Sequence, residues 1–320
     1  MGFAQSLQDG DNSIMLRLIV RIGLPFCLAL STIASAQQPP SALSVDPPQD
    51  AKYPDSMVSL ADVPSHGENL LGAFYLASGA GPHPTVVLMH GFPGYEQNLD
   101  LAQAIRRAGW NVLAVHYRGS WGVKGAFSFQ HAMEDADAEV AFVIDPANAK
   151  KYRVDASRIV LIGHSMGGFM VASAAAHDRK VAGIAMISAW NIGASFPPAS
   201  NGTSQHAEDE GARNALIESF TRDNDAAPLA GCTVESLVNE AYEHRGAWNF
   251  NDFAATLASR PVMVVSSDDG LAPADQTFAT ALQKAGNTRV TEAHFPTDHA
   301  YSDHRVALTT ALLNWLATLQ

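Results

Sequence analysis

The sequence predicts an α/β fold, in which a mostly parallel, doubly wound sheet is covered by helices and carries a small helical cap insert. Short apolar runs alternate with helical segments, and the runs lack the apolar–polar alternation of a half-exposed strand. The runs that predict strands are 85–90, 111–116, 158–162, 181–187, 261–265 and 289–293. The segments that predict helices are 99–108, 129–144, 166–176, 274–285 and 306–319.

Composition and charge are those of an ordinary globular protein and argue against two classes of partner. The chain has 320 residues, of which 47% are hydrophobic and 16% charged, enough apolar material for one large domain with an insert. The formal net charge is −12, and an acidic protein is a poor candidate for binding nucleic acid or an anionic membrane surface. Composition leaves the oligomeric state open.

The N-terminal segment, residues 1–36, has the pattern of an export signal. Two arginines precede an apolar run over 22–30, and a small-x-small triplet of the kind that signal peptidase accepts ends at Ala36. Because the run is too short for a comfortable membrane span, we expect cleavage near Ala36, export to the periplasm or the medium and no stable membrane insertion afterwards. A retained anchor is the alternative. Met15 directly precedes the pattern, so we interpret residues 1–14 as an extension upstream of the natural start.

Two further segments divide the chain. Residues 37–55 are rich in Pro, Gln, Ser and Asp and are interpreted as a linker to a folded domain over 56–320. Residues 189–255 contain no clear strand and show helical patterns near 212–222 and 234–244. Inserts of this kind lie at the carboxyl ends of strands, where ligands bind in open α/β sheets, so this segment predicts a helical cap. A surface elaboration without a binding role is the alternative.

Cysteine usage predicts neither a disulfide nor a sulfur-based metal site. The only two cysteines are Cys27 and Cys232, and Cys27 leaves with the signal. Cys232 then has no partner within the chain, even in an oxidising compartment. No cluster of cysteines indicates zinc or an iron–sulfur centre.

The strongest chemical signal is the motif Gly-His-Ser-Met-Gly over 163–167. It lies between the run 158–162 and the helical segment 166–176, where a sharp strand-to-helix turn holds a serine in a strained conformation with its oxygen exposed. Glycines flank such a serine because larger side chains would collide with neighbouring elements. Ser165 is therefore the predicted nucleophile, and helix N-terminal amides would face the developing negative charge.

A second glycine-containing motif, His-Gly-Phe-Pro-Gly over 90–94, directly follows the run 85–90. A loop of this kind lets a backbone N–H approach a reacting carbonyl. We expect the amides of Phe92 and Met166 to form an oxyanion hole. A purely structural turn is the alternative, since turns also favour glycine and proline.

The predicted acid follows the run 261–265, in the segment Ser-Ser-Asp-Asp-Gly-Leu-Ala-Pro over 266–273. A carboxylate at the end of this strand can orient a histidine and stabilise its charged form. Adjacent residues point in different directions, so only one aspartate should serve. We favour Asp269 for its Asp-x-x-Ala-Pro context and keep Asp268 as the fallback.

The predicted base lies in the segment His-Phe-Pro-Thr-Asp-His-Ala-Tyr over 294–301, between the last strand and the last helix. A histidine on this loop can reach the serine as general base. We favour His299 over His294, because His299 lies just before the helix and His294 ends the strand. The order serine, aspartate, histidine, with each residue placed after a separate strand, carries the prediction of a catalytic triad.

From about residue 56 to 320 the chain resembles the α/β-hydrolase superfamily, and within it the branch of prolyl-oligopeptidase-like and dienelactone-hydrolase-like serine hydrolases. Three segments carry the resemblance: Tyr-Arg-Gly-Ser at 117–120, the stretch 158–168 around the serine, and the Asp-x-x-Ala-Pro segment. The resemblance implies an α/β-hydrolase fold, a Ser-His-Asp triad, no metal, no organic cofactor, and a small-molecule or peptide acyl substrate.

The sequence departs from this branch in two places. Too few residues precede the fold for a propeller domain, and Ser266-Ser267 stands where His-Gly is often found. Both departures favour an esterase over a true peptidase. We therefore expect a serine hydrolase that cleaves an ester or amide bond through an acyl-enzyme, with carboxylesterase-like activity favoured. An aminopeptidase-like or oligopeptidase-like enzyme and a non-catalytic hydrolase-like binding protein are the alternatives.

Weaker signals have two interpretations each. Trp190, Trp248 and Phe250 border the predicted cap and either line an acyl pocket or pack at its hinge. The polar cluster over 294–304 contains residue types that bind metals, which would make a metal-dependent hydrolase, but one loop rarely aims so many side chains inward. Arg118 and Ser120 are expected to anchor their loop.

Overall fold

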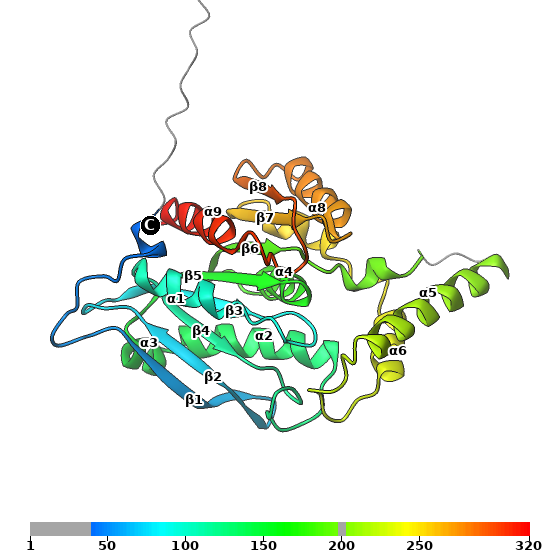
Figure 1. Cartoon of the computed structure of the whole chain (residues 1–320), viewed down its shortest axis with the longest axis horizontal. Coiled ribbons are helices and arrows are strands. Elements are labelled where there is room, and N and C mark those ends of the chain that lie inside the picture. Colours follow the sequence, from blue (N-terminus) through cyan, green and yellow to red (C-terminus); the bar gives the residue numbers. More distant parts are fainter. Residues whose placement is uncertain (1–39, 198–202) are drawn as a thin grey trace, which may run out of the picture. The chain divides into compact units, whose positions relative to one another are not determined.

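The computed structural model describes residues 40–197 and 203–320, and it contains one eight-stranded sheet in that part of the chain (Figure 1). The strands lie in the order β1-β2-β4-β3-β5-β6-β7-β8. Their bounds are β1 Ser56–Ser65, β2 Glu68–Leu76, β3 His83–Met89, β4 Asn111–Val115, β5 Val154–His164, β6 Val181–Ile187, β7 Val262–Ser267 and β8 Val290–Phe295. The first two strands are antiparallel to their neighbours, and all pairs from β4 to β8 are parallel.

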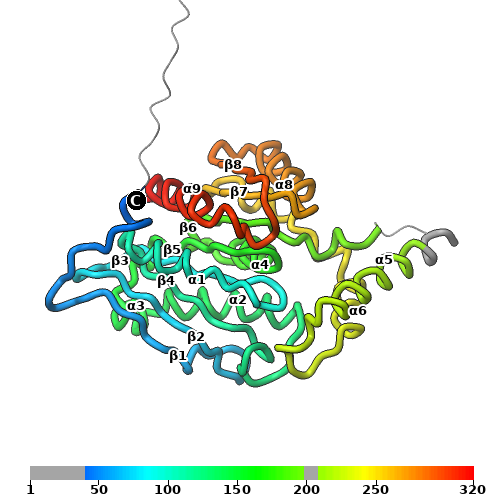
Figure 2. Tube along the Cα trace, in the orientation of Figure 1, coloured from blue at the N-terminus to red at the C-terminus, as the bar shows by residue number. Residues whose placement is uncertain are grey.

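Helices connect the parallel strands, as the chain trace shows (Figure 2). The α-helices are α1 Leu99–Arg107, α2 Phe129–Ile144, α3 Pro146–Tyr152, α4 Met166–His177, α5 Thr203–Arg222, α6 Val234–Glu243, α7 Ala254–Leu257, α8 Ala272–Lys284 and α9 Arg305–Ala317. Three short 3-10 helices are η1 Ser41–Leu43, η2 Ile192–Ser195 and η3 Phe250–Phe253.

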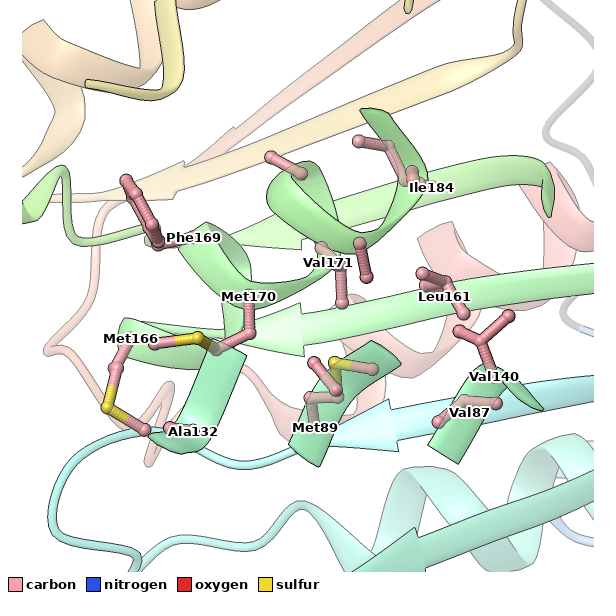
Figure 3. Close-up of a cluster of buried hydrophobic side chains, with 14 of the residues drawn as sticks. Val87, Met89, Ala132, Val140, Leu161, Met166, Phe169, Met170, Val171 and Ile184 are labelled. Atoms are coloured by element: carbon pink, nitrogen blue, oxygen red, sulfur yellow. The ribbon is translucent and has the colours of Figure 1, made fainter. Parts of the chain in front are cut away.

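The two faces of the sheet pack against different helices because successive strand residues point in opposite directions. Val86 and Leu88 of β3 belong to a core with α1 and α9, while Val87 and Met89 belong to a core with α2, α4 and α8. Figure 3 shows part of the second core, where Met89 lies near side chains of α2 and α4. The central strands of the sheet are therefore buried on both faces, which explains their continuous apolar runs.

The predicted fold class is confirmed. Six strands and five helices lie where the apolar pattern placed them, with ends shifted by a few residues. The antiparallel hairpin of β1 and β2 had not been predicted as strands. β1 mixes exposed and buried residues and is interrupted by a bulge between Leu60 and Val63, so it lacks a continuous apolar run. The short helix α3 was also missed.

The predicted cap segment holds α5 and α6 and, in its described residues, no strand. The helix α5 begins at Thr203, well before the predicted start near residue 212. The first part of the helix was not predicted because the sequence before residue 212 is mostly polar. It contains too few apolar residues to show a helical period. α5 and α6 pack against each other in the connection between β6 and β7 (Figure 1).

The described part of the predicted linker packs against the fold. Ala42 of η1 is buried in the core with α1 and α9, and its carbonyl accepts a hydrogen bond of 2.7 Å from Arg107 Nε. The predicted export signal, its cleavage point at Ala36 and the start of the linker lie outside the described residues. Within the part of the chain that the structure describes, no helix is both long and apolar enough to cross a membrane.

Candidate active site

The turn at Ser165 has the strained geometry that its motif predicts. Ser165 lies between β5 and α4 with φ 57° and ψ −122°, and its amide donates to the carbonyl of Ile187 on β6 at 2.9 Å. A Cβ on Gly163 would lie 2.0 Å from the carbonyl oxygen of Gly167, and one on Gly167 would lie 2.2 Å from that of Met89. Glycine is therefore required at both positions for β3, β5 and α4 to approach.

The loop after β3 lies against Ser165. A Cβ on Gly91 would lie 2.9 Å from Ser165 Cβ and 3.4 Å from its Oγ, so the backbone of Gly91 passes directly beside the hydroxyl. Phe92 is the next residue of this loop. Met166 is the first residue of α4, so its amide has no acceptor within the helix. The two amides predicted to form an oxyanion hole thus belong to residues adjoining Ser165 and Gly91.

Asp269 and His299 are brought together, 30 residues apart in sequence, by a hydrogen bond of 2.7 Å from His299 Nδ1 to Asp269 Oδ2. The carboxylate is buried, while the imidazole is 43% exposed. Burial alone would raise the pKa of Asp269, but hydrogen bonds from His299, the Leu271 amide and Ser188 outweigh it and hold that pKa well below its usual range. Asp269 is therefore ionised and can stabilise a protonated His299.

His164 connects the His299 loop to the serine. Its Nε2 lies 2.8 Å from the carbonyl oxygen of His299, and the two imidazole rings lie 4.6 Å apart. Burial, reinforced by the nearby imidazole of His299, lowers the pKa of His164 to about 3, so His164 is neutral and donates its Nε2 proton. Within the described residues, Ser165 Oγ makes no hydrogen bond to His299; such catalytic bonds are often long before substrate binds.

The neighbouring aspartate serves a different histidine. Asp268 Oδ1 lies 3.1 Å from His294 Nε2, and His294 Nδ1 lies 3.0 Å from Ser266 Oγ. Asp268 and His294 are both largely exposed, whereas Asp269 is buried. The two adjacent aspartates thus have different histidine partners: the buried Asp269 pairs with His299, and the exposed Asp268 pairs with His294.

Behind Asp269 lies a polar cluster that the sequence analysis missed. Ser188 Oγ lies 3.0 Å from Ser267 Oγ and 2.8 Å from Tyr301 Oη, and all three side chains are buried. The same Ser188 hydroxyl donates to Asp269. Ser188 directly follows β6, so its place at a strand end was the signal that could have revealed it.

Comparison with known proteins identifies the family. A model of the alpha/beta hydrolase family matches residues 86–310, which is more than half of the chain. This chain belongs to the alpha/beta hydrolase family. It is 36% identical over 119 residues to an uncharacterized 31.7 kDa protein from the traX-finO intergenic region of Escherichia coli, a match that spans 36% of this chain and 40% of the relative.

Solved structures of esterases share the fold of this alpha/beta hydrolase. EstE1, a thermophilic carboxylesterase cloned from a metagenomic library, is 20% identical with a TM-score of 0.58, covering 86% of this chain and 92% of EstE1. The esterase Est22 is 18% identical with a TM-score of 0.59, covering 83% and 82%. A Pyrococcus furiosus esterase is 14% identical with a TM-score of 0.58, covering 86% and 97%. At these identities the likeness concerns the fold.

Four aromatic side chains pack together near the serine turn of this hydrolase; Phe92 and Trp190 are partly exposed, whereas Phe220 and Phe129 are buried. The amide of Trp190 donates to the carbonyl of Ser165 at 2.9 Å, and its ring lies 6.5 Å from that of Phe92. Phe220, from the cap helix α5, lies 4.8 Å from Phe92 and 6.0 Å from Trp190. Together with Phe129, 5.3 Å from Trp190, these rings form the group that we call the aromatic wall.

The other two aromatic residues singled out in the sequence are buried by packing. Trp248 is stacked on His244 with ring centroids 4.4 Å apart, and it borders the aromatic wall 6.4 Å from Phe129. Phe250 is fully buried 5.1 Å from Phe278 of α8, which corresponds to the packing interpretation rather than the pocket interpretation. Of Trp190, Trp248 and Phe250, Trp190 is the one that forms a hydrogen bond with Ser165.

The polar segment 294–304 is divided into separate pairs. His294 pairs with Asp268, His299 with Asp269, and His304 with Asp303 at 2.8 Å. Among the described residues, no three His, Cys, Asp or Glu side chains are grouped so that they could hold a metal ion. Each histidine of the segment is thus oriented by a single carboxylate.

A cavity of about 300 Å³ lies elsewhere, lined by Tyr75 and Leu88 and by the rings of His90 and His116. None of Ser165, Asp269 and His299 lines it.

Arg118 anchors its loop as expected: its guanidinium is buried against Asp135, with Nε 2.6 Å from Oδ1.

Proposed function

We propose that this protein is a serine hydrolase that cleaves carboxylic esters through an acyl-enzyme. Ser165 attacks the carbonyl carbon of the ester while His299 removes its proton through Nε2. His299 then delivers that proton to the departing alcohol, leaving the acyl group on Ser165. A water molecule, deprotonated by the same histidine, releases the acid and restores the serine.

The hydrogen bond between Asp269 and His299 is the observation that carries the proposal. It orients Nε2 of the imidazole away from the carboxylate, and the buried, ionised Asp269 stabilises the imidazolium that forms during attack. Met166 follows Ser165, and Phe92 follows Gly91, whose backbone passes beside Ser165, so the amides of Phe92 and Met166 would hold the developing oxyanion. His164 is neutral at its side, so it adds no competing positive charge.

An ester with an apolar acyl group is the favoured substrate. Phe92 and Trp190 are partly exposed and lie close to Ser165 in the fold, and buried Phe220 packs behind Phe92; such an apolar surface suits a hydrocarbon chain or ring. Two proteins of the same fold, EstE1 and Est22, are esterases, which supports an ester as the substrate. The experiments below separate this function from a non-catalytic binding protein. Comparison of aminoacyl p-nitroanilides with p-nitrophenyl esters separates it from a serine peptidase, which would cleave the amides at comparable rates.

The first prediction concerns the nucleophile. Ser165→Ala removes the attacking oxygen but fits the same turn, so we expect hydrolysis of a p-nitrophenyl ester to fall by about 10⁴-fold or more while the fold survives. Circular dichroism and a thermal melt check that the variant is folded. The release of p-nitrophenol over time measures the rate. Unchanged turnover in this variant would overturn the proposal and favour a metal-dependent or other route.

The second prediction compares variants of the Asp269–His299 pair with variants of the Asp268–His294 pair. We expect Asp269→Asn and His299→Ala to lower kcat by about 10³-fold to 10⁴-fold, because each removes the oriented base. Asp268→Asn and His294→Ala disturb a similar but exposed pair, in which Asp268 adjoins Asp269 and His294 lies on β8, and we expect changes below about threefold. Equal losses from both sets would contradict the assignment.

We also propose export of the mature protein after cleavage near Ala36, on the basis of the N-terminal pattern. N-terminal sequencing of the protein recovered outside the cytoplasm tests it. A start immediately after Ala36 is expected, and recovery of residues upstream of that position would show that the segment is retained.

A further inference from the structure

Two histidines outside the proposed triad lie in contact beside the loop 90–94. His90 directly follows β3 and His116 directly follows β4, and these two strands are neighbours in the sheet. His90 Nε2 lies 3.3 Å from His116 Nδ1, and the two ring centroids lie 5.2 Å apart. His90 is buried, and His116 is partly exposed. Nothing in the proposed triad chemistry uses either imidazole.

The ring of His90 holds one peptide unit of the loop. Its Nδ1 lies 2.8 Å from the carbonyl oxygen of Gly91. This carbonyl shares a rigid, planar peptide unit with the amide of Phe92, which is one of the two donors proposed for the oxyanion. A hydrogen bond that fixes the direction of the carbonyl therefore also fixes the direction of that N–H.

Other side chains hold different peptide units of the loop. Tyr117 Oη donates to the carbonyl oxygen of His90 at 3.1 Å, and Trp121 Nε1 donates to that of Pro93 at 2.8 Å. Among the described residues, no side chain other than His90 donates to the Gly91 carbonyl. The orientation of this unit thus depends on whether the imidazole of His90 carries a proton on Nδ1.

The two contacts of His90 determine which of its nitrogens is protonated. A carbonyl oxygen only accepts hydrogen bonds, so Nδ1 carries a proton. Burial, reinforced by the nearby imidazole of His116, lowers the pKa of His90 to about 4, so at neutral pH the ring holds one proton and Nε2 is bare. A bare Nε2 only accepts. His116 Nδ1 must therefore be the donor across the 3.3 Å contact.

We propose that His116 is a positioning residue of the oxyanion hole, which keeps the proton of His90 on Nδ1 and thereby holds the Gly91–Phe92 peptide. The inference rests on the proposed function, because it concerns one amide of that reaction. Without the donor at Nε2, the proton of His90 can move to that nitrogen. The bare Nδ1 would then face the Gly91 carbonyl oxygen, and two acceptors at such a distance repel each other.

The kinetic test compares two substitutions of similar size and shape. His116→Asn keeps an N–H donor at the same number of bonds from the backbone as Nδ1, whereas His116→Leu has no donor. We expect His116→Leu to lower kcat for p-nitrophenyl acetate about tenfold and to leave KM within about twofold, because the oxyanion forms only in the transition state. His116→Asn should stay within about threefold of the wild type. His177→Ala, at an exposed histidine, is the control and should change neither quantity.

Three kinetic outcomes overturn the inference. Equal losses of kcat in His116→Asn and His116→Leu would assign His116 a role in packing alone. An unchanged kcat in His116→Leu would show that the peptide is held without this donor. A change confined to KM would show that the residue acts on substrate binding and not on the oxyanion.

A second readout is independent of catalysis. Long-range ¹H–¹⁵N spectra of protein labelled at histidine show which ring nitrogen carries the proton, and comparison with His90→Asn identifies the signals of His90. In the wild type at neutral pH we expect the proton on Nδ1. His116→Asn should keep this tautomer, and His116→Leu should show a mixture. A wild-type proton on Nε2 would overturn the inference even if neither variant of His116 folds, and so would an unchanged tautomer in His116→Leu.

These tests separate the inference from the proposed function. If Ser165→Ala keeps full activity, the proposed function fails, while the spectra still report the tautomer of His90. If Ser165→Ala is inactive but His116→Leu keeps the wild-type kcat and tautomer, the triad stands and only the role of His116 is lost.

Discussion

At the level of single residues, three of the eight non-glycine residues with positive φ in the described chain lie at the site. Ser165, Ser188 and Tyr301 are non-glycine residues with φ of 57°, 43° and 58°, and all three border the Asp269–His299 pair or the serine turn. Positive φ is costly for such residues, and the surrounding hydrogen bonds hold them in place. This backbone conformation places the hydroxyls of Ser165 and Ser188 where a regular extended strand end would not place them.

The sequence predicted residues that belong to motifs and missed those that do not. Ser165 has flanking glycines, and Asp269 and His299 each follow a strand, so their types and spacing could be recognised. Ser188 and Tyr301 are single residues of common types, and only the folded chain shows that they meet behind Asp269. Their roles depend on tertiary packing, which no local pattern encodes.

The third prediction concerns Tyr301. Tyr301→Phe removes the hydroxyl that contacts Ser188 and leaves a buried polar group with one partner fewer, so the free energy of unfolding should fall by about 1 kcal/mol. Because Ser188 also supports Asp269, kcat should fall while KM changes little. Tyr95→Phe, at an exposed tyrosine, is the control and should change neither quantity. A normal kcat in Tyr301→Phe would show that this cluster does not support the pair.

At the scale of elements, the cap helix α5 contributes to the aromatic wall. Phe220 is the residue of that wall that lies on a cap helix, and its ring packs against Phe92 and Trp190. The cap segment was predicted from the interrupted strand rhythm, but the part that α5 plays could not be, since a lone phenylalanine on a mostly polar helix gives no sign of what it contacts.

The fourth prediction concerns this helix. Phe220→Ala removes apolar surface beside the serine, so kcat/KM should fall about tenfold for hexanoyl and benzoyl esters and little for acetyl esters. A panel of p-nitrophenyl esters of different acyl length measures the effect. Glu218→Ala, at an exposed position of the same helix, should leave the panel unchanged. Equal losses for acetyl and hexanoyl esters would place the acyl group elsewhere.

At the scale of the whole described domain, a buried ion pair joins distant elements. Asp135 of α2 is fully buried and contacts Arg118 of the loop after β4 and Ser65 at the end of β1. The parallel part of the sheet could be predicted because its strands are continuous apolar runs. The β1–β2 hairpin could not, and this ion pair is one of the contacts that attach it to the rest of the fold.

The fifth prediction concerns this ion pair. Asp135→Ala leaves the buried guanidinium of Arg118 with a weaker set of partners, so the free energy of unfolding should fall by about 3 kcal/mol in urea titrations. Asp137→Ala, on the same helix, removes an exposed carboxylate 3.7 Å from His177 and should change stability by less than about 0.5 kcal/mol. Similar losses in both variants would contradict a special role for the buried pair.

Covalent labelling is the sharpest test of whether Ser165 is the nucleophile that His299 activates. Wild-type protein is incubated with a fluorophosphonate, and the modified peptide is identified by mass spectrometry alongside Ser165→Ala, His299→Ala and His294→Ala. We expect one adduct, on Ser165, absent from the first variant, strongly slowed in the second and unaffected in the third. Labelling at another residue, or no labelling of the folded wild type, would show that Ser165 is not an activated nucleophile.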